Sequence, residues 1–395
     1  MSIDVARARA ETPGAENAIH FNNSGASLMP QPVIDALKTH IDLEAEKGGY
    51  EAATVAADQI EHTYDALARL INCDRSEIAV VENATVAWDM AFYGLAADMR
   101  PGDRILTAMA EYASNYIAYL QVKRRTGVTI DVVPNDESGQ LDVAALESML
   151  DDRVKLISIT HVPTGGGLVN PAAAVGRVAK RHGIPYLLDA CQSVGQMSID
   201  VEEIGCDMLS ATGRKFLRGP RGIGFLYVRT SMLEKIDPPF LDLHAATWVG
   251  PDSYELRPDA RRFENWENYV AGKIGLGVAA DYAMGWGLDD IYGRVRSLAD
   301  GLRQRLSDLP GVTVLDIGRE RCGIVTFAHE RVKADAIVKG LTDRNIHCST
   351  SGRSSTLLDM SDRGLDLIVR SPVHYYNTED EVDRFVDATA DVLRG

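Results

Sequence analysis

The sequence predicts an α/β protein with a large domain built on a mainly parallel, doubly wound sheet. Residues 155–160 (KLISIT) and 184–190 (IPYLLDA) are short apolar runs without alternation, typical of strands buried on both faces. The segment between them begins near Pro171 and ends at Gly183, which are helix start and stop signals. A strand, a helix and a strand of this length form a parallel crossover, and similar apolar runs recur between residues 78 and 134.

A chain of 395 residues suits one large and one small domain. We expect an N-terminal segment, 1–19, that packs on the small domain, and a large domain over 20–270. Residues 271–395 are expected to form a long connecting helix, bent at Gly285 and Gly287, and a smaller α+β domain. The last helix starts with a capping box from Thr378 to Glu381.

Composition restricts the class of protein. The net charge of −16 disfavours nucleic acid and anionic membranes as main partners, so an anionic ligand needs a local cluster of donors. No apolar run approaches the ~20 residues of a membrane span, and the N-terminus lacks the apolar core of a secretory signal. The five cysteines are widely spaced and odd in number. They predict free thiols in a reducing, cytoplasmic compartment, without a disulfide framework or a metal site.

Polar residues follow several of the predicted strands. Ligands of open α/β sheets bind beyond the carboxyl ends of the strands, so these positions are the candidate site. Each has an ordinary alternative: Thr85 could be a helix N-cap, Asp189 a turn residue and Lys215 a solvated side chain. Their joint occurrence at strand ends favours a binding site. The segments are 83–85, 111–112, 161–167, 189–192 and 212–215.

One set of motifs resembles a known family. Asp189-x-x-Gln192 is followed by Ser210-x-Thr212-x-Arg214-Lys215 and then by Gly219-Pro220-x-Gly222. This order is similar to the class V aminotransferase superfamily, whose members use pyridoxal phosphate and include cysteine desulfurases and selenocysteine lyases. The resemblance covers nearly the whole chain. It implies the fold type I of pyridoxal-phosphate enzymes and an amino-acid substrate.

The resemblance also implies a role for each matched residue. Lys215 would form the Schiff base with the cofactor and then act as a base. Nearby Arg214, Arg218 and Arg221 should lower its pKa. Asp189 would keep the pyridine nitrogen protonated. Gln192 would contact the phenolic oxygen, and Tyr112 takes the place of a ring-stacking histidine. The phosphate would be held by Ala84, Thr85, Thr212 and Arg214, with Thr164 where many relatives have asparagine.

The small domain would supply the substrate contacts. Arg370 matches the arginine that binds the substrate α-carboxylate. Arg353 and His374 are candidates for a second anionic group, and Asn23 is a further candidate for substrate binding.

Departures from the family pattern indicate the reaction. Desulfurases carry a catalytic cysteine before the carboxylate arginine, whereas residues 349–360 (STSGRSSTLLDM) contain none. Cys348 precedes this loop and is expected in a strand. Residues 40–53 and the 111–115 motif look closer to a branch that includes a sulfoxide C–S lyase of ergothioneine synthesis. The resemblance therefore favours a β-lyase without a persulfide on the enzyme, with an aminotransferase or an epimerase as the alternative.

Two other classes of protein have weaker support from the sequence, and the resemblance also implies an oligomeric state. A nicotinamide-dependent dehydrogenase lacks support, because no G-x-G-x-x-G follows the first strand. A catalytically silent partner subunit is disfavoured by the intact Lys215, Asp189 and Arg370. The resemblance implies a homodimer with composite sites that involve residues 248–254. Trp266-Glu267 replaces the Gly-Thr that gives a phosphate contact across the dimer, which puts that contact in doubt.

Overall fold

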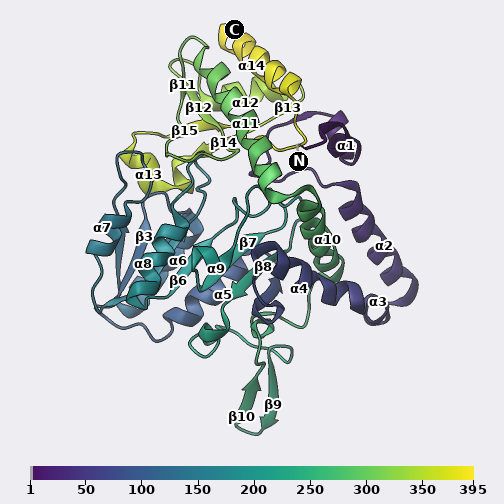
Figure 1. The fold of residues 1–395 in the computed structure, drawn as a ribbon, viewed down its shortest axis with the longest axis vertical. Helices are drawn as coiled ribbons and strands as arrows, with labels where there is room; N and C mark the ends of the chain where they lie inside the picture. The colour runs from purple at the N-terminus through teal and green to yellow at the C-terminus, as the bar shows by residue number, and fades with distance from the viewer. Residues whose placement is uncertain (1–2) are drawn as a thin grey trace.

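Residues 3–395 are described by the structure, a computed structural model. Figure 1 shows a large domain, a smaller C-terminal domain above it, and a β-hairpin that projects from the large domain on the opposite side. Within the described residues, no helix is long and apolar enough to cross a membrane.

The large domain is built on a seven-stranded sheet of order β2-β8-β7-β6-β5-β3-β4. Strands β3, β4, β5, β6 and β7 run parallel to one another, whereas β8 pairs antiparallel with both β7 and β2. The predicted α/β fold with a mainly parallel sheet is confirmed. The strands are β2 Ile78–Val81, β3 Arg104–Ala108, β4 Thr129–Val133, β5 Val154–Thr160, β6 Tyr186–Asp189, β7 Met208–Thr212 and β8 Gly224–Val228.

Helices cover both faces of this sheet. Leu188 of β6 belongs to one core cluster, together with residues of α4 (Ala57–Ile71), α8 (Ala172–His182) and α10 (Val270–Trp286). The adjacent Leu187 belongs to a second cluster, with residues of α5 (Ala84–Ala96) and α6 (Ala113–Thr126). Successive side chains of a strand point to opposite faces, so an apolar strand without alternation needs a helix layer on each side.

The remaining elements of the large domain lie around this layered core. The antiparallel hairpin of β9 (Ala246–Gly250) and β10 (Ser253–Leu256) is the projection at the bottom of Figure 1. The other helices before residue 206 are α1 Val5–Ala10, α2 Gln31–Lys47, α3 Gly49–Val55, α7 Val143–Ser148 and α9 Val201–Ile204.

The small domain has a four-stranded antiparallel sheet of order β11-β12-β15-β14. The predicted capping box is present: the Thr378 side chain accepts from the Glu381 amide, and the Glu381 side chain accepts from the Thr378 amide. The elements are α11 Leu288–Ser307, β11 Val312–Val314, β12 Thr326–His329, α12 Ala334–Thr342, β14 Ser349–Gly352, α13 Leu357–Asp362, β15 Leu367–Arg370 and α14 Glu379–Arg394.

The long helical stretch that connects the domains is broken rather than bent. Gly287, with φ of +83°, separates α10 from α11, whereas Gly285 lies inside α10. A side chain at Gly287 would be strained in this conformation. Helix α10 packs on α2 and α4, and α11 packs on α14 and β11, so the break lies where the chain passes between the two domains.

The N-terminal segment contacts the small domain. Strand β1 (Ile19–His20) pairs in parallel with β13 (Ile346–His347). Arg9 of α1 donates hydrogen bonds to the Tyr376 carbonyl and to the Glu381 carboxylate. Residues 1–2 of the predicted segment lie outside the described residues.

Candidate active site

Segments that carry several of the predicted site residues end side by side at the carboxyl edge of the large sheet. This edge faces the small domain (Figure 1). Asp189 is the last residue of β6, and its strand neighbours are Thr160, the last residue of β5, and Ser210 of β7. Parallel strands that end together place the segments that follow them side by side.

Lys215 lies in the loop after β7, between Thr212 and the turn at Gly219. The loop is closed by a 2.7 Å hydrogen bond from the Gly219 amide to the Gly213 carbonyl. Burial lowers the pKa of Lys215, the charges of Cys191 and Asp189 oppose this shift, and Arg214 and Arg370 add to it. The expected lowering of the pKa of Lys215 is confirmed, but burial is its main cause. A lowered pKa makes the neutral amine available at lower pH, and the neutral amine is the form that acts as a nucleophile or a base.

Arg218 is not among the main causes of the lowered pKa of Lys215. This arginine is buried and has a left-handed backbone, with φ of +61°. Its guanidinium donates to the Leu28 carbonyl, the Tyr375 hydroxyl and the Thr12 hydroxyl. Arg218 therefore ties the loop of Lys215 to the N-terminal segment and the small domain. Arg221 is exposed and is not among the groups that shift the lysine.

The Asp189 carboxylate is buried and receives one hydrogen bond on each oxygen. The Cys191 amide donates to Oδ1 at 2.9 Å, and the Asn115 side chain donates to Oδ2 at 3.0 Å. These donors fix the plane of the carboxylate and leave lone pairs for a cationic N–H.

A second buried carboxyl, Glu111, lies behind Asp189. It accepts from Asn115 Nδ2 at 2.9 Å, from the Thr107 hydroxyl at 2.9 Å and from the Thr160 hydroxyl at 2.5 Å. Burial raises the pKa of Glu111 to about 7. The sequence motif contains Glu111 and Asn115, but no role was predicted for either. Their four-residue spacing across a helix start was the available signal, because such residues share one face.

An anion cradle lies at the start of α5. The N-cap is Asn83, whose side chain accepts from the Val86 amide, so Thr85 is not the cap. The approach of β8 is tight: a Cβ on Gly224 would lie 2.6 Å from the Ala211 carbonyl oxygen and 3.1 Å from the Ala84 nitrogen. The Ala84 amide therefore lies near the end of β7, where Thr212 is located. The first amides of a helix and a hydroxyl in its first turn, here that of Thr85, are the donors that a phosphate site requires.

Arg370, at the end of β15, reaches the large domain. Its guanidinium donates to the Thr164 hydroxyl at 2.5 Å, to the Thr164 carbonyl at 3.2 Å and to the Ser349 hydroxyl at 3.2 Å. Burial lowers the pKa of Arg370 to about 10, while nearby Tyr112 raises it, and the side chain stays cationic at neutral pH. Since its acceptors are neutral oxygens, its charge is available for a carboxylate ligand.

Several buried polar atoms at this edge have no partner within the described residues. They are Oε1 of Gln192, Nδ1 of His161 and Oγ of Ser24. Gln192 Nε2 donates to the Ser24 carbonyl at 3.2 Å and reaches the Thr164 hydroxyl at 3.4 Å, so Ser24 and Gln192 are neighbours. Buried polar atoms without partners indicate a polar ligand at the place where they gather.

Three predicted substrate residues have other contacts. His374 is buried between its neighbours: Nε2 bonds the Phe216 carbonyl at 2.9 Å and Nδ1 accepts from the Tyr375 amide. Burial holds the pKa of His374 well below its usual value, so it is a neutral structural link and not an anion-binding group. Arg353 donates to the Leu365 carbonyl and lies 3.8 Å from Asp366.

Asn23 is also engaged. Its amide donates to the Pro372 carbonyl at 2.9 Å, and its oxygen accepts from the Tyr376 hydroxyl at 2.5 Å. Asn23 thus joins the start of the large domain to the small domain, and its contacts do not support direct substrate binding.

The cysteines differ in their distance from the site. Cys348 was expected in a strand, but it is the residue between β13 and β14, because the chain leaves one strand and enters the next at this position. It is buried in the core of the small domain, and burial raises its pKa to about 12. Cys191, for which no role was predicted, interacts with Asp189 and Lys215, and burial raises its pKa well above the usual value. All five cysteines are unpaired, and residues 3–395 hold no cluster of three His, Cys, Asp or Glu side chains suited to a metal.

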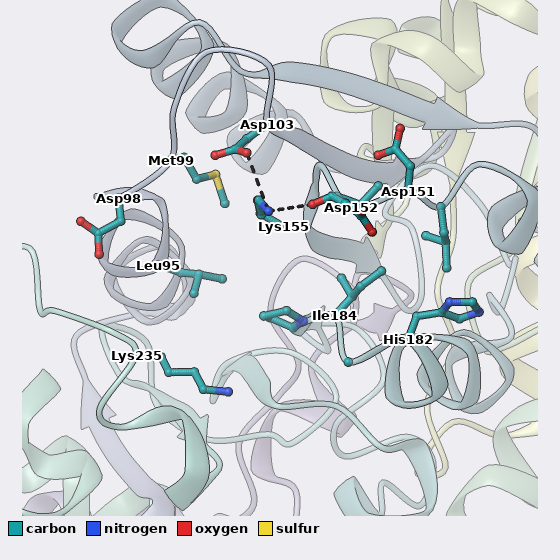
Figure 2. A pocket seen from close by; sticks show the side chains of 14 residues that line it. Leu95, Asp98, Met99, Asp103, Asp151, Asp152, Lys155, His182, Ile184 and Lys235 are labelled. Atoms are coloured by element: carbon teal, nitrogen blue, oxygen red, sulfur yellow. Dashed lines mark hydrogen bonds and ion pairs between the residues drawn. The ribbon is translucent and has the colours of Figure 1, made fainter.

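A cavity of about 730 Å³ lies at the opposite, amino-terminal ends of β3, β5 and β6. Figure 2 shows the side chains that line it. Some of its charged groups have partners: Lys155 donates to the Asp152 carbonyl at 2.7 Å and lies 3.9 Å from Asp103. Asp151 pairs with Arg153 at 2.6 Å. None of the residues predicted for the site lines this cavity.

The fold and the site together define an enzyme with a lysine and a carboxylate at the sheet edge and an arginine from a second domain. Residues 19–385 match the family model "Aminotransferase class-V". The chain belongs to the class V aminotransferase family, which confirms the resemblance in the motifs.

Individual relatives are of similar length. A probable cysteine desulfurase of Halalkalibacterium halodurans is 31% identical over 379 residues, which cover 92% of this chain and 90% of the relative. One of Methanothermobacter thermautotrophicus is 28% identical, covering 95% and 94%. The apo cysteine desulfurase of Thermococcus onnurineus has a TM-score of 0.93 at 26% identity, covering 100% of this chain and 99% of that structure.

Another similar structure is the cystine C–S lyase C-DES in complex with its reaction product, cysteine persulfide. It has a TM-score of 0.86 at 25% identity and covers 96% of this chain and 99% of that structure. These neighbours confirm the expected fold type I architecture.

Proposed function

We propose that the chain is a pyridoxal-phosphate-dependent β-lyase that acts on cysteine or a similar β-substituted amino acid without holding sulfur as an enzyme persulfide. The observation that carries the proposal is the meeting of Lys215, Asp189 and Arg370 at one sheet edge, beside a loop, 349–360, that contains no cysteine. The comparisons support an enzyme of the family that includes cysteine desulfurases and C–S lyases. The β-lyase reaction itself is our proposal.

The residues fit the cofactor. The partnerless atoms of Gln192, His161 and Ser24 lie at the edge where a polar ring with a phenolic oxygen would satisfy them. The start of α5 would hold the phosphate through the Ala84 and Thr85 amides and the Thr85 hydroxyl, with Thr212 and Arg214 beside it. A related C-DES variant carries glycine linked to a pyridoxal-phosphate cofactor, which supports the same group here.

When bound, pyridoxal phosphate supplies an electron sink that stabilises negative charge on the substrate α-carbon. The chain's residues supply the rest. Asp189, held by Asn115 and the Cys191 amide, would keep the ring nitrogen protonated. Arg370 would bind the α-carboxylate, and the neutral amine of Lys215 would take the α-proton.

The missing loop cysteine favours release of the sulfur fragment into solution. Loss of the α-proton and departure of the β-substituent with its bonding electrons leave an unsaturated amino acid, which water converts to pyruvate and ammonia. The thiols of Cys348 and Cys191 have raised pKa values, so few are ionised at neutral pH, and a thiolate is the form that attacks sulfur. The C–S lyase among the structural neighbours is bound to cysteine persulfide as its reaction product, which supports release of the sulfur fragment.

The test is a panel of β-substituted amino acids, including cysteine and cystine, incubated with the loaded enzyme. Pyruvate, ammonia, keto acid and racemised amino acid are measured separately. Pyruvate and ammonia in equal amounts support the β-lyase. A keto acid that keeps the substrate side chain would establish an aminotransferase, and racemisation alone an epimerase, since all three need Lys215, Asp189 and Arg370.

We also propose a homodimer with composite sites. Large apolar side chains on and near the projecting hairpin are exposed, including Trp248 at 80% and Tyr254 at 55%. Exposed apolar patches of this kind are typical of protein interfaces. Five unpaired cysteines support a reducing, cytoplasmic location.

A further inference from the structure

One amide group joins two buried carboxyl groups behind the proposed cofactor site. The Asn115 nitrogen donates to Glu111 Oε1 at 2.9 Å and to Asp189 Oδ2 at 3.0 Å. An NH2 group has two hydrogens, so both bonds can form at the same time. Asn115 is near the start of α6, Asp189 ends β6 and Glu111 follows β3, so three elements are fixed relative to each other.

Glu111 is almost enclosed, with 3% of its surface exposed. Besides Asn115, its hydrogen-bond donors are the Thr107 and Thr160 hydroxyls and its neighbour's amide, Tyr112 N–H at 2.8 Å. All of these donors are neutral. Four donors favour the carboxylate form, yet burial without a cation opposes it, so Glu111 is poised to ionise near neutral pH.

We propose that Glu111 is a positioning residue: acting through Asn115, it orients the Asp189 carboxylate, and its charge strengthens the hold of Asp189 on the proton of the cofactor ring nitrogen. The inference rests on the proposed function only through the presence of the cofactor. A second negative charge near the ring nitrogen favours its protonated, cationic form, and an oriented carboxylate accepts a charge-assisted hydrogen bond from it.

The titratable groups around the pair are few. Asp189 faces Glu111 from β6, and its charge helps to raise the pKa of Glu111. Tyr119 faces it from α6, and burial, with the charge of Glu111, raises the pKa of Tyr119 well above its usual value. On the far side, Cys191 and Lys215 interact with Asp189. Burial raises the pKa of Glu111 to about 7, so its charge changes near neutral pH.

The experiment uses holoenzyme loaded with 15N-labelled pyridoxal phosphate. The ring-nitrogen chemical shift reports its protonation by NMR, whichever substrate the enzyme takes. Glu111→Gln keeps the size and an acceptor oxygen but removes the charge. We expect a ring-nitrogen signal moved toward the unprotonated value, a kcat lower by roughly tenfold and a KM within about twofold of wild type, since the substrate contacts are untouched.

Two further variants separate positioning from packing. In Asn115→Ala the bridge is absent, so adding Glu111→Gln should lower kcat by clearly less than the roughly tenfold expected in the wild-type background, since only the effect of the charge remains. Glu77→Gln is the matched control, because Glu77 is a buried glutamate that binds the Thr230 amide and hydroxyl, away from the site. It should leave the ring-nitrogen signal and kcat at the wild-type values.

A wild-type ring-nitrogen signal and kcat in folded Glu111→Gln would overturn the inference while leaving the proposed function intact. A protein that binds no cofactor at all would overturn both. If Glu111→Gln does not fold, wild-type enzyme still decides. Its ring-nitrogen signal should move toward the protonated value as the pH rises through about 7, the pKa of Glu111, and a signal that stays constant there overturns the inference.

Discussion

Lys215 is the residue on which the proposed chemistry depends. Its lowered pKa makes the neutral amine available at a lower pH than for a solvated lysine. We predict that borohydride reduction of the holoenzyme, followed by peptide mapping, places the pyridoxyl group on Lys215 alone. Lys180 on α8 is an exposed lysine in the same protein and serves as the internal control. A modified peptide from any other lysine would refute the assignment.

Asp189 gives a second test at the residue scale. In Asp189→Asn the donors Asn115 and Cys191 N–H lose a charged acceptor, and the ring nitrogen loses its anionic partner. We expect a folded protein that binds the cofactor and turns over slower by roughly a hundredfold or more. Circular dichroism and the visible absorption of the bound cofactor check folding and loading. Wild-type turnover in a loaded variant would contradict the role.

The cysteines test the absence of an enzyme persulfide. We predict that a variant with all five cysteines replaced by alanine keeps its turnover. It should lose stability at the buried positions, by about 1 kcal/mol each for the small volume removed. Cys348→Ala and Cys191→Ala are also measured singly, because Cys348 precedes the loop and Cys191 lies beside Lys215. Loss of activity in folded, loaded Cys348→Ala would replace the β-lyase with a desulfurase that has a relocated nucleophile.

The sequence predicted some site residues better than others. Lys215, Asp189, Gln192 and Arg370 stand in ordered motifs, and the structure brings their segments together. The contacts of His374 and Arg353 could not be predicted from sequence. Both side chains hydrogen-bond to backbone carbonyl groups, those of Phe216 and Leu365, which come close only in the folded chain. The role of Glu111 and Asn115 was missed because Asn115 joins Glu111 to Asp189, which is distant in sequence.

At the scale of elements, helix α5 combines a backbone cradle with a free hydroxyl. Asn83 caps the helix, so the Thr85 hydroxyl is available to an anion. We predict that Thr85→Val weakens cofactor binding by roughly tenfold, the loss of one hydrogen bond to a charged group, with little effect on stability. Thr342→Val, at an exposed helical threonine of the small domain, is the control. Equal cofactor affinity in both variants would show that Thr85 does not hold the phosphate.

The order and type of most elements were predictable, because burial on both faces and helix signals leave clear patterns in sequence. Two features were not. A short apolar run reads alike in both directions, so the antiparallel orientation of β8 depends on the tertiary fold. Gly285 and Gly287 look equivalent in sequence, and only the positive φ of Gly287 shows which one ends α10.

At the scale of the whole molecule, the site needs both domains. Arg370 of the small domain donates a hydrogen bond to Thr164 of the large domain. Asn23, at the start of the large domain, donates a hydrogen bond to the Pro372 carbonyl of the small domain. Arg218 links the loop of Lys215 to Thr12 and Tyr375. A change in how the domains close would therefore move the substrate arginine relative to the lysine.

The projecting hairpin leads to the last prediction. A two-stranded hairpin is marginally stable alone, and Trp248 and Tyr254 lie opposite each other on it, both exposed. We predict that the protein is a dimer by analytical ultracentrifugation, that each hairpin packs on the partner, and that Trp248→Ala impairs the partner's site. Mixing inactive Lys215→Ala with Trp248→Ala should then restore activity, because one site of each heterodimer keeps its own Lys215 and receives an intact hairpin. Random exchange between subunits gives roughly a quarter of wild-type activity. Leu367→Ala, at an exposed leucine of β15, is the control and should be fully active without mixing. A fully active monomer, or mixtures no more active than their components, would exclude composite sites.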